Sequence, residues 1–256
     1  MTMDTIPFEG PQYAAEPRQI RRGVKPAAWK AAIYGGSGLG KTTLAAKAPR
    51  AFVLDLERGT DRVECDSTPE QLTTLTEVFG WLKWFKEEQS EFQTVVIDTI
   101  DELDKMLSSL VVARYGKSDV KTVADIPYGR GGDMLVAEWR LLIEALDRIV
   151  ASGKNVLFTG HEQIIKFENP SDANFDFVTI NTHKKVAPVL VAKLDAVLHA
   201  SLETHVIDKN DKGKGKATGS GRRILRTTQL PSVIAKNRFN LPDVLPLDAV
   251  LFDKMK

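Results

Sequence analysis

The sequence predicts an α/β fold: a mainly parallel, twisted sheet with helices on both faces and antiparallel strands toward the C-terminus. Short apolar segments alternate with helix-like segments up to about residue 160, which is the pattern of βαβ units. One of these segments, 94–98, is a β-branched run that ends in an acid, as parallel strands buried on both faces do. The pattern changes after residue 195, where strand-like runs follow one another and favour an antiparallel extension of the sheet.

The composition indicates a folded globular chain. The 256 residues are 43% hydrophobic and 27% charged, which excludes a low-complexity disordered protein. Residues 1–26 contain four prolines and little periodicity, so we expect an N-terminal arm there and one domain over 27–256. That domain is expected to carry a basic hairpin near 207–226.

The elements can be justified in chain order from local patterns. A hydroxyl residue, a proline and an acid at 67–70 resemble a helix start, and the apolar residues that follow have helical spacing as far as Phe85. Pro49 should end the first helix. We expect strands at 31–34, 51–55, 94–98 and 155–159, and helices at 41–47, 67–85, 102–114 and 134–151.

The remaining segments lack strong periodicity or form short strands. Residues 115–133 and 162–184 are polar, and we expect loops there. Strands are expected at 196–200, 204–207 and 223–227, with a flexible basic tip at 209–216.

Cysteine use and apolar run lengths bear on location. The single cysteine, Cys65, cannot form an internal disulfide or a cysteine-based zinc site, so we expect a packing role for it in an intracellular protein. The N-terminus lacks a signal-peptide pattern, and no apolar run reaches 18 residues. We therefore expect a cytoplasmic protein without a membrane partner.

A glycine-rich segment between the first expected strand and helix matches the P-loop pattern Gly-x4-Gly-Lys-Thr in full. Its glycines let backbone N–H groups turn inward around phosphates, and a helix start favours an anion. Lys41 would reach the outer phosphates. The expected nucleotide-binding residues are Gly35, Gly36, Ser37, Gly38, Leu39, Gly40, Lys41, Thr42 and Thr43.

A magnesium site is expected beside the P-loop. The Thr42 hydroxyl is placed to ligate Mg²⁺. Asp98 ends a buried strand downstream of the P-loop, where a second carboxylate holds Mg²⁺ directly or through water. We expect Thr42 and Asp98 to form the metal site.

Hydrolysis needs a base that aligns water at the γ-phosphate. Thr99 stands directly after Asp98, where many P-loop ATPases carry a glutamate, so the base must come from elsewhere. Glu57 follows the second strand and would reach the same sheet edge. Glu102, one helical turn past Asp98, and Asp55 are alternatives, and the absence of a base is a third.

The P-loop, the Asp-x-Glu at 55–57 and the segment Val96-Ile97-Asp98-Thr99-Ile100 resemble the RecA-type ATPase core. Over about 27–250 the chain resembles phage-encoded RecA-like ATPases, some of which act in single-strand annealing and recombination. The resemblance implies ATP as the nucleotide. It places His161 where relatives carry a γ-phosphate sensor, usually Gln.

Lys236 and Arg238 match a late Lys-x-Arg pair that RecA-like rings and filaments insert into the neighbouring subunit's ATP site. The pair would stabilise charge on the transferring phosphoryl group. This implies a homo-oligomer, either a ring or a filament.

The resemblance further implies that the protein binds single-stranded DNA through the two polar loops. A single-strand-binding protein is a second partner that the resemblance allows. Basic groups with an aromatic for stacking suit single strands. The candidates are Lys117, Lys121, Tyr128, Arg130, Lys166, Lys184 and Lys185 in the loops, and Lys212, Lys214, Lys216, Arg222 and Arg223 in the basic hairpin.

Net charge does not exclude this role. The chain carries 35 Lys+Arg and 34 Asp+Glu, yet residues 209–238 hold nine Lys/Arg and one Asp. A basic C-terminal segment is therefore joined to a mildly acidic body.

Other functions also fit the motifs. An ATP-driven switch or assembly factor acting on a protein partner would need no DNA. A small-molecule kinase is less favoured because no arginine-rich lid lies between the two motifs. A GTPase is also disfavoured, because no Asn-Lys-x-Asp guanine motif occurs.

Overall fold

The computed structural model describes residues 27–87, 91–167, 174–209 and 215–255. The expected N-terminal arm, 1–26, lies outside the described residues, as do Lys212 and Lys214 of the basic tip.

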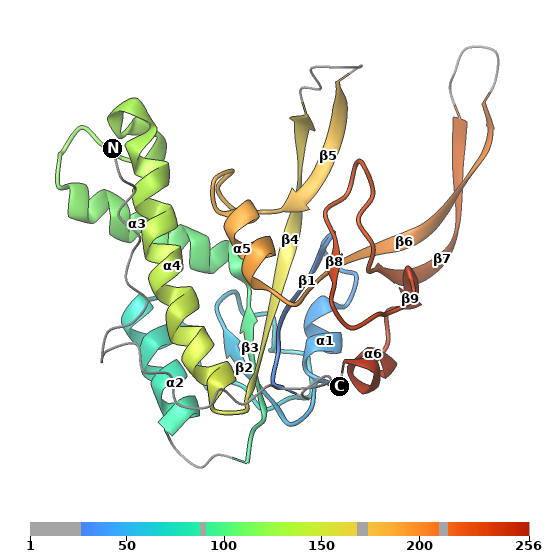
Figure 1. Cartoon of the computed structure of the whole chain (residues 1–256), viewed down its shortest axis with the longest axis horizontal. Helices are drawn as coiled ribbons and strands as arrows, with labels where there is room; N and C mark the ends of the chain where they lie inside the picture. Colours follow the sequence, from blue (N-terminus) through green and yellow to red (C-terminus); the bar gives the residue numbers. More distant parts are fainter. Residues whose placement is uncertain (1–26, 88–90, 168–173, 210–214, 256) are drawn as a thin grey trace, which may run out of the picture.

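The described chain forms a nine-stranded mixed sheet with the strand order β2-β3-β4-β1-β6-β7-β9 (Figure 1). The five strands β2, β3, β4, β1 and β6, in this spatial order, are parallel to one another, and β7 is antiparallel to β6. Strand β5 pairs with β4, and β8 pairs with β6. The strands are β1 Lys30–Gly35, β2 Ala51–Asp55, β3 Thr94–Asp98, β4 Asn155–Phe167, β5 Phe175–Ile180, β6 Ala196–Lys209, β7 Gly215–Arg226, β8 Lys236–Asn237 and β9 Val244–Pro246. The predicted α/β class and mostly parallel sheet are confirmed.

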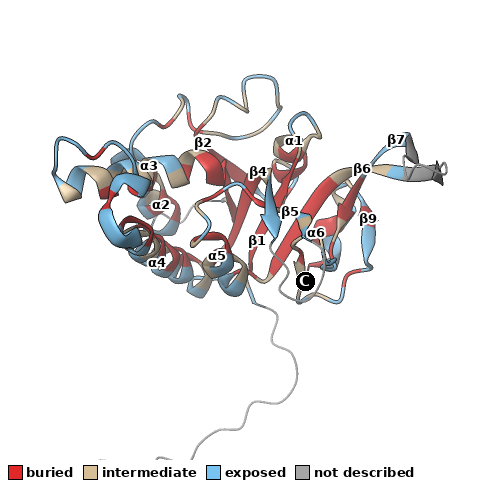
Figure 2. Ribbon diagram, turned by 90° about the horizontal axis from the view of Figure 1, so that it is seen from above, coloured by how far each residue is buried: buried red, intermediate tan, exposed pale blue. Residues whose placement is uncertain are grey.

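Helices cover both faces of the sheet, as expected, but unequally. Buried side chains of α2, α3, α4 and α5 pack on one face, and those of α1 and α6 pack on the other. Figure 2 shows the buried strands between these layers. The helices are α1 Lys41–Ala45, α2 Leu75–Glu87, α3 Ile100–Tyr115, α4 Arg130–Ala151, α5 Ala187–Lys193 and α6 Val250–Lys254. Within the described residues, no helix is both long and apolar enough to cross a membrane.

The predicted helix start at 67–70 is wrong. Ser67 forms a parallel bridge with Val53, and the Thr68 hydroxyl accepts a hydrogen bond from the Asp55 amide at 3.2 Å. The hydroxyl therefore serves the neighbouring strand instead of a helix. Helix α2 begins later, where the Thr74 hydroxyl accepts from the Glu77 amide and the Glu77 carboxylate accepts from the Thr74 amide. This is a capping box.

The expected loop at 115–133 is also corrected. Two 3-10 turns, Val123–Asp125 and Pro127–Gly129, lie within it, and α4 begins at Arg130 instead of residue 134. Position 131 lies inside the helix and requires glycine, because a Cβ there would collide with the Val123 carbonyl. The glycine at this position therefore indicates close packing of helix α4 against the preceding segment and does not indicate a loop.

Two further segments are more regular than expected. Strand β4 extends to Phe167 and pairs antiparallel with β5, so most of the described residues in the expected loop at 162–184 belong to two paired strands. The strands expected at 196–200 and 204–207 are one strand, β6, with a register shift between Leu202 and Thr204. Polar residues on hairpins that project beyond the core hide the alternation on which a strand prediction depends.

We predict opposite stability effects for two glycine-to-alanine changes. Gly80 is exposed inside α2, and nothing lies within 4 Å of a Cβ placed there. Gly80→Ala should raise the free energy of unfolding by about 0.5–1 kcal/mol, because alanine loses less backbone entropy. Gly131→Ala should lower it by about 1–3 kcal/mol through overpacking. Urea unfolding midpoints measure both, and equal effects would contradict the packing assigned to Gly131.

Candidate nucleotide-binding site

The strand register brings the candidate residues to one edge of the sheet. Gly35, the last residue of β1, lies level with His161 of β4 and Ala200 of β6. Asp55 and Asp98 end β2 and β3 at the same level as each other. The P-loop leaves β1 at this edge, which is where ligands of parallel sheets bind.

Asp98 is the buried centre of the site. Its Oδ2 accepts a hydrogen bond from the Thr42 hydroxyl at 3.0 Å, and its Oδ1 accepts one from the Thr159 hydroxyl. Burial raises the pKa of Asp98, and the two hydroxyls oppose this rise. Asp98 is therefore held against the P-loop by β4 as well as by its own strand.

The arrangement of Thr42 and Asp98 fits a Mg²⁺ site. One hydroxyl and one carboxylate oxygen lie within 3.0 Å of each other, and both are oxygen ligands of the kind that Mg²⁺ prefers. The described residues include no group of three or more His, Cys, Asp or Glu that could hold a metal ion. A cation here would therefore depend on phosphate oxygens for further ligands, as Mg²⁺ in nucleotide sites does.

The ammonium group of Lys41 lies in the P-loop among carbonyl and carboxylate oxygens. Its ammonium donates to the carbonyls of Gly35 at 3.1 Å and Gly36 at 2.8 Å. Burial lowers the pKa of Lys41, while four nearby carboxylates oppose the shift. These belong to Glu57, Asp101, Asp98 and Glu162.

Glu57 adjoins this centre through Thr99, the residue that follows Asp98. Its Oε2 accepts a hydrogen bond from the Thr99 hydroxyl at 3.3 Å. Burial, with a contribution from Asp98, raises the pKa of Glu57. A raised pKa suits a group that must accept a proton. Glu102 instead pairs with Lys105 at 2.6 Å on the surface of α3.

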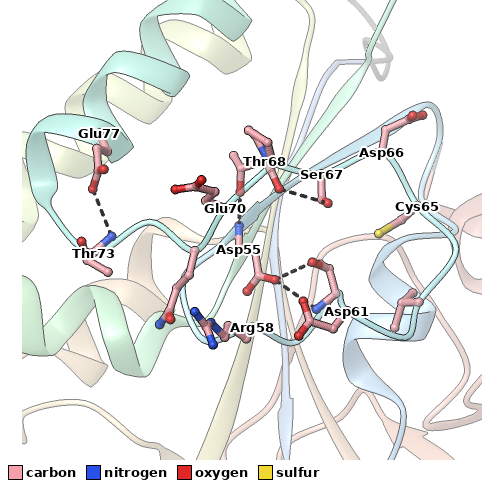
Figure 3. Close-up of a pocket in the computed structure, with 14 residues that line it drawn as sticks. Asp55, Arg58, Asp61, Cys65, Asp66, Ser67, Thr68, Glu70, Thr73 and Glu77 are labelled. Atoms are coloured by element: carbon pink, nitrogen blue, oxygen red, sulfur yellow. Dashed lines mark hydrogen bonds between the residues drawn. The ribbon is translucent and has the colours of Figure 1, made fainter.

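Asp55, the other rival, is occupied by its own loop. Its carboxylate accepts hydrogen bonds from the amides of Glu57, Gly59 and Thr60, each at 3.1 Å, and from the Thr60 hydroxyl. Burial alone would raise the pKa of Asp55, but these hydrogen bonds outweigh it and lower the pKa. Figure 3 shows this carboxylate turned toward its loop. Asp55 is one of the residues that line a polar cavity of about 960 Å³. Asp55 therefore shapes the turn that carries Glu57.

The same turn crosses the metal site. A Cβ on Gly59 would lie 2.6 Å from Oδ2 of Asp98 and 3.5 Å from Oγ1 of Thr42. Only a residue without a side chain lets the backbone approach these two groups so closely.

His161 is held by a residue that the sequence analysis missed. Asp101, buried in the first turn of α3, accepts from the His161 amide at 2.8 Å and from the Asn181 side chain at 2.6 Å. The His161 Nδ1 lies 3.5 Å from the same carboxylate. An acid in a first helical turn, next to a strand-end motif, was the only local signal for this role.

Glu162 is a second missed residue. Its Oε1 lies 3.6 Å from a Cβ placed on Gly36, and its Oε2 lies 2.7 Å from Nε2 of His199. It therefore adjoins the P-loop from β4. The alternation along an expected strand would have pointed to it had β4 been predicted beyond residue 159.

The Lys236 and Arg238 pair lies at the opposite edge of the sheet from its own P-loop. Lys236 is level with Val197 at the start of β6, and its ammonium donates to the carbonyls of Val191 and Ala192 at the end of α5. Arg238 pairs with Asp195 at 3.0 Å, and its side chain is 58% exposed. The pair therefore lies away from its own P-loop, and Arg238 is the more exposed of the two.

Some DNA candidates are brought together and others are not. The Lys185 ammonium contacts the Gly129 carbonyl at 3.2 Å and the Asp133 carboxylate at 2.7 Å, so the two expected loops adjoin. Lys184, Arg130 and Tyr128 are exposed at this junction. The other described candidates lie apart: Lys117 is 5.6 Å from the Tyr115 ring centroid, Lys121 precedes a 3-10 turn, Lys166 is on β4, and Lys216, Arg222 and Arg223 are on β7.

Two solved structures are similar to this chain at low sequence identity. A search of curated proteins finds no match. The flagellar accessory protein FlaH from Methanocaldococcus jannaschii is similar in structure, with 13% identity, 78% of each chain covered and a TM-score of 0.35. A KaiC-like protein from Pyrococcus horikoshii OT3 has 14% identity, with 78% of this chain and 79% of that chain covered and a TM-score of 0.37.

A family model described as an AAA domain matches residues 27–239, which is most of the chain and includes the whole nucleotide site. The chain therefore belongs to the AAA domain family and is a P-loop NTPase that hydrolyses ATP.

Proposed function

We propose that this ATPase uses Mg²⁺, assembles as a homo-oligomer on single-stranded DNA and assists recombination or strand annealing. This is the role of phage-encoded RecA-like ATPases, which the sequence resembles, and it places the protein in the cytoplasm of a bacterial host. The observation that carries the DNA role is a fully exposed aromatic ring, Tyr128, beside two exposed cations.

In the proposed reaction, Glu57 orients a water molecule toward the γ-phosphorus and accepts its proton as the bond to the β–γ bridging oxygen breaks. Lys41 stabilises the negative charge on the phosphate oxygens. Thr42 and Asp98 would hold Mg²⁺, which neutralises charge on the β- and γ-phosphates when bound. His161, whose amide is anchored by Asp101, would sense the γ-phosphate.

Two substitutions should separate binding from chemistry. Lys41→Ala should abolish turnover, because the buried ammonium at the P-loop is lost. Glu57→Gln should retain ATP binding but lower kcat by about 10²–10⁴-fold, the usual contribution of a general base. Steady-state ATPase assays and nucleotide titrations measure both effects. Glu102→Gln is the matched control and should keep full activity; full activity in Glu57→Gln would reject Glu57 as the base.

The proposed oligomer rests on the position of Arg238. This exposed guanidinium lies at the end of the parallel strands opposite to its own P-loop, and this position favours contact with the nucleotide of another copy. Lys236 helps to position Arg238, because its hydrogen bonds to the end of α5 hold strand β8, which directly precedes Arg238. A positive charge inserted from a neighbour would stabilise the transferring phosphoryl group.

Arg238→Ala should lower kcat by about 10³-fold or more, as loss of an arginine finger does. Mixing it with Glu57→Gln should restore part of the activity, because a Glu57→Gln subunit can supply its Arg238 to an intact neighbouring site. Turnover of the mixture measures this. Failure of any mixing ratio to restore activity would contradict action between subunits.

The proposed DNA surface consists of Tyr128, Arg130 and Lys184. Tyr128 is 98% exposed, and its backbone has a positive φ of 58°, which a non-glycine residue rarely adopts. Such a conformation persists where the surroundings hold it and clusters at functional positions. The Lys185 contacts described above hold this turn against the segment that carries Lys184. An exposed ring beside cations suits base stacking and phosphate contact on a single strand.

Tyr128→Ala should weaken the binding of single-stranded DNA by roughly 10-fold, because one stacked base contributes about 1–3 kcal/mol. Tyr128→Phe is the matched control and should bind as the wild type does, since the ring is retained. Fluorescence anisotropy with a labelled oligonucleotide at low salt, where phosphate contacts are strongest, measures both.

Wild-type protein that fails to bind the oligonucleotide at low salt, while still hydrolysing ATP, would refute the DNA role. The function would then be the alternative, an ATP-driven switch or assembly factor that acts on a protein partner. Exposed apolar residues on the β4–β5 hairpin, Ile164 and Phe167, are the feature that favours this second candidate.

A further inference from the structure

Arg223 lies at the P-loop, although the sequence placed it in a DNA-binding hairpin. Strand β7 is antiparallel to β6, with Leu225 level with Ala200 and Arg223 level with Leu202. Ala200 is in turn level with Gly35, the last residue of β1. Arg223 is therefore two residues beyond the end of β1, at the height where the P-loop leaves the sheet.

The side chain of Arg223 faces the P-loop side of the sheet. Side chains alternate along a strand, so Arg223 and Leu225 share one face, and Arg226 lies on the other. Leu225 is buried in the cluster that contains Leu44 and Ala45 of α1. The face of β7 that carries Arg223 is thus the face on which the P-loop and α1 lie.

A direct proximity confirms this orientation. The Nη1 atom of Arg223 would lie 3.1 Å from a Cβ placed on Gly40, and Cδ2 of Leu247 would lie 4.0 Å from it. Gly40 immediately precedes Lys41 in the segment whose amides surround the phosphates. The Arg223 backbone is fixed, because its carbonyl accepts a hydrogen bond from the Leu247 amide at 3.1 Å.

The charges at the site leave Arg223 available for an anion. In the part of the chain that the structure describes, Arg223 takes part in none of the salt bridges. Lys41, in contrast, has four carboxylates around it. A guanidinium has donors in a planar fork that matches phosphate oxygens, and it stays charged under all working conditions.

We propose that Arg223 is a nucleotide-binding residue that acts within its own subunit, with its guanidinium contacting the phosphates held at Gly40. This rests on ATP binding by the P-loop. It extends the phosphate site to a residue of β7, so that nucleotide binding fixes the base of the β6–β7 hairpin. Arg223 and Arg238 then have different roles, because only Arg223 lies at the nucleotide edge of its own sheet.

The test is a titration of the full chain, without DNA, with ATP, ADP, AMP and inorganic tripolyphosphate, by isothermal calorimetry. Arg223→Ala should raise the Kd for ATP, ADP and tripolyphosphate by roughly 10-fold or more, as expected for a lost hydrogen bond to a charged group. Arg223→Lys should fall in between, because it keeps the charge without the fork. Arg226→Ala, on the same strand but the other face, should bind like the wild type.

Three results would overturn the proposal. Unchanged affinity for ADP and tripolyphosphate in Arg223→Ala would remove the phosphate contact. Weaker binding of ATP, ADP and AMP with unchanged tripolyphosphate binding would indicate a contact to the base or ribose instead. Unchanged nucleotide affinity with weaker binding of a labelled oligonucleotide would return Arg223 to the DNA surface. Wild-type protein that binds no ATP would count against the function itself and not against this residue.

The urea midpoints of both Arg223 variants establish that they are folded. If Arg223→Ala is unfolded, Arg223→Lys decides the question: it should still show a weaker Kd for tripolyphosphate than the wild type, and an unchanged Kd would contradict the proposal.

Discussion

The hydrogen bonds that surround the Asp98 carboxylate hold the nucleotide site together. An ionised carboxylate taken out of water is strongly destabilised unless its oxygens find donors. Here one donor comes from the P-loop, through Thr42, and the other from β4, through Thr159. The cost of burying this charge is therefore offset only when β3, β4 and the P-loop are in register. The turn at Gly59 closes over the same carboxylate and carries Glu57 with it.

Charge balance explains much of the remaining arrangement. Four carboxylates act on Lys41, whereas ATP brings a further set of negative charges to the same edge. Anionic phosphates can be held there only with additional cations or backbone donors. Mg²⁺, if held by Thr42 and Asp98, would supply positive charge from the β3 side of the P-loop, and Arg223 would supply it from the β7 side. The pair formed by half-buried Glu162 and buried His199 lies on the two strands next to β1, with Glu162 beside Gly36.

Local sequence patterns predicted the features that depend on neighbouring residues in the chain. The P-loop, the buried strands at 51–55 and 94–98, and the long helix before β4 follow from motif, β-branched runs and helical spacing. The errors arose where a residue served a distant partner. Thr68 looks like a helix cap but bonds to Asp55 of β2, and Gly131 looks like a loop residue but packs on the Val123 carbonyl. The actual helix cap, Thr74 with Glu77, was also present in the sequence, but the pattern at 67–70 matched a helix start more closely.

The sequence by itself determined that this protein has a P-loop at the end of a strand, with an acid-terminated strand downstream. Only the tertiary structure decided how the other candidates divide. Glu57 lies near Asp98 while Asp55 is saturated by its own turn and Glu102 pairs with Lys105. Arg238 is far from its own P-loop, whereas Arg223 adjoins it. The reason is the strand order: β1 pairs with β4 and β6, which are more than a hundred residues away in the chain, and local periodicity contains no information about such pairing.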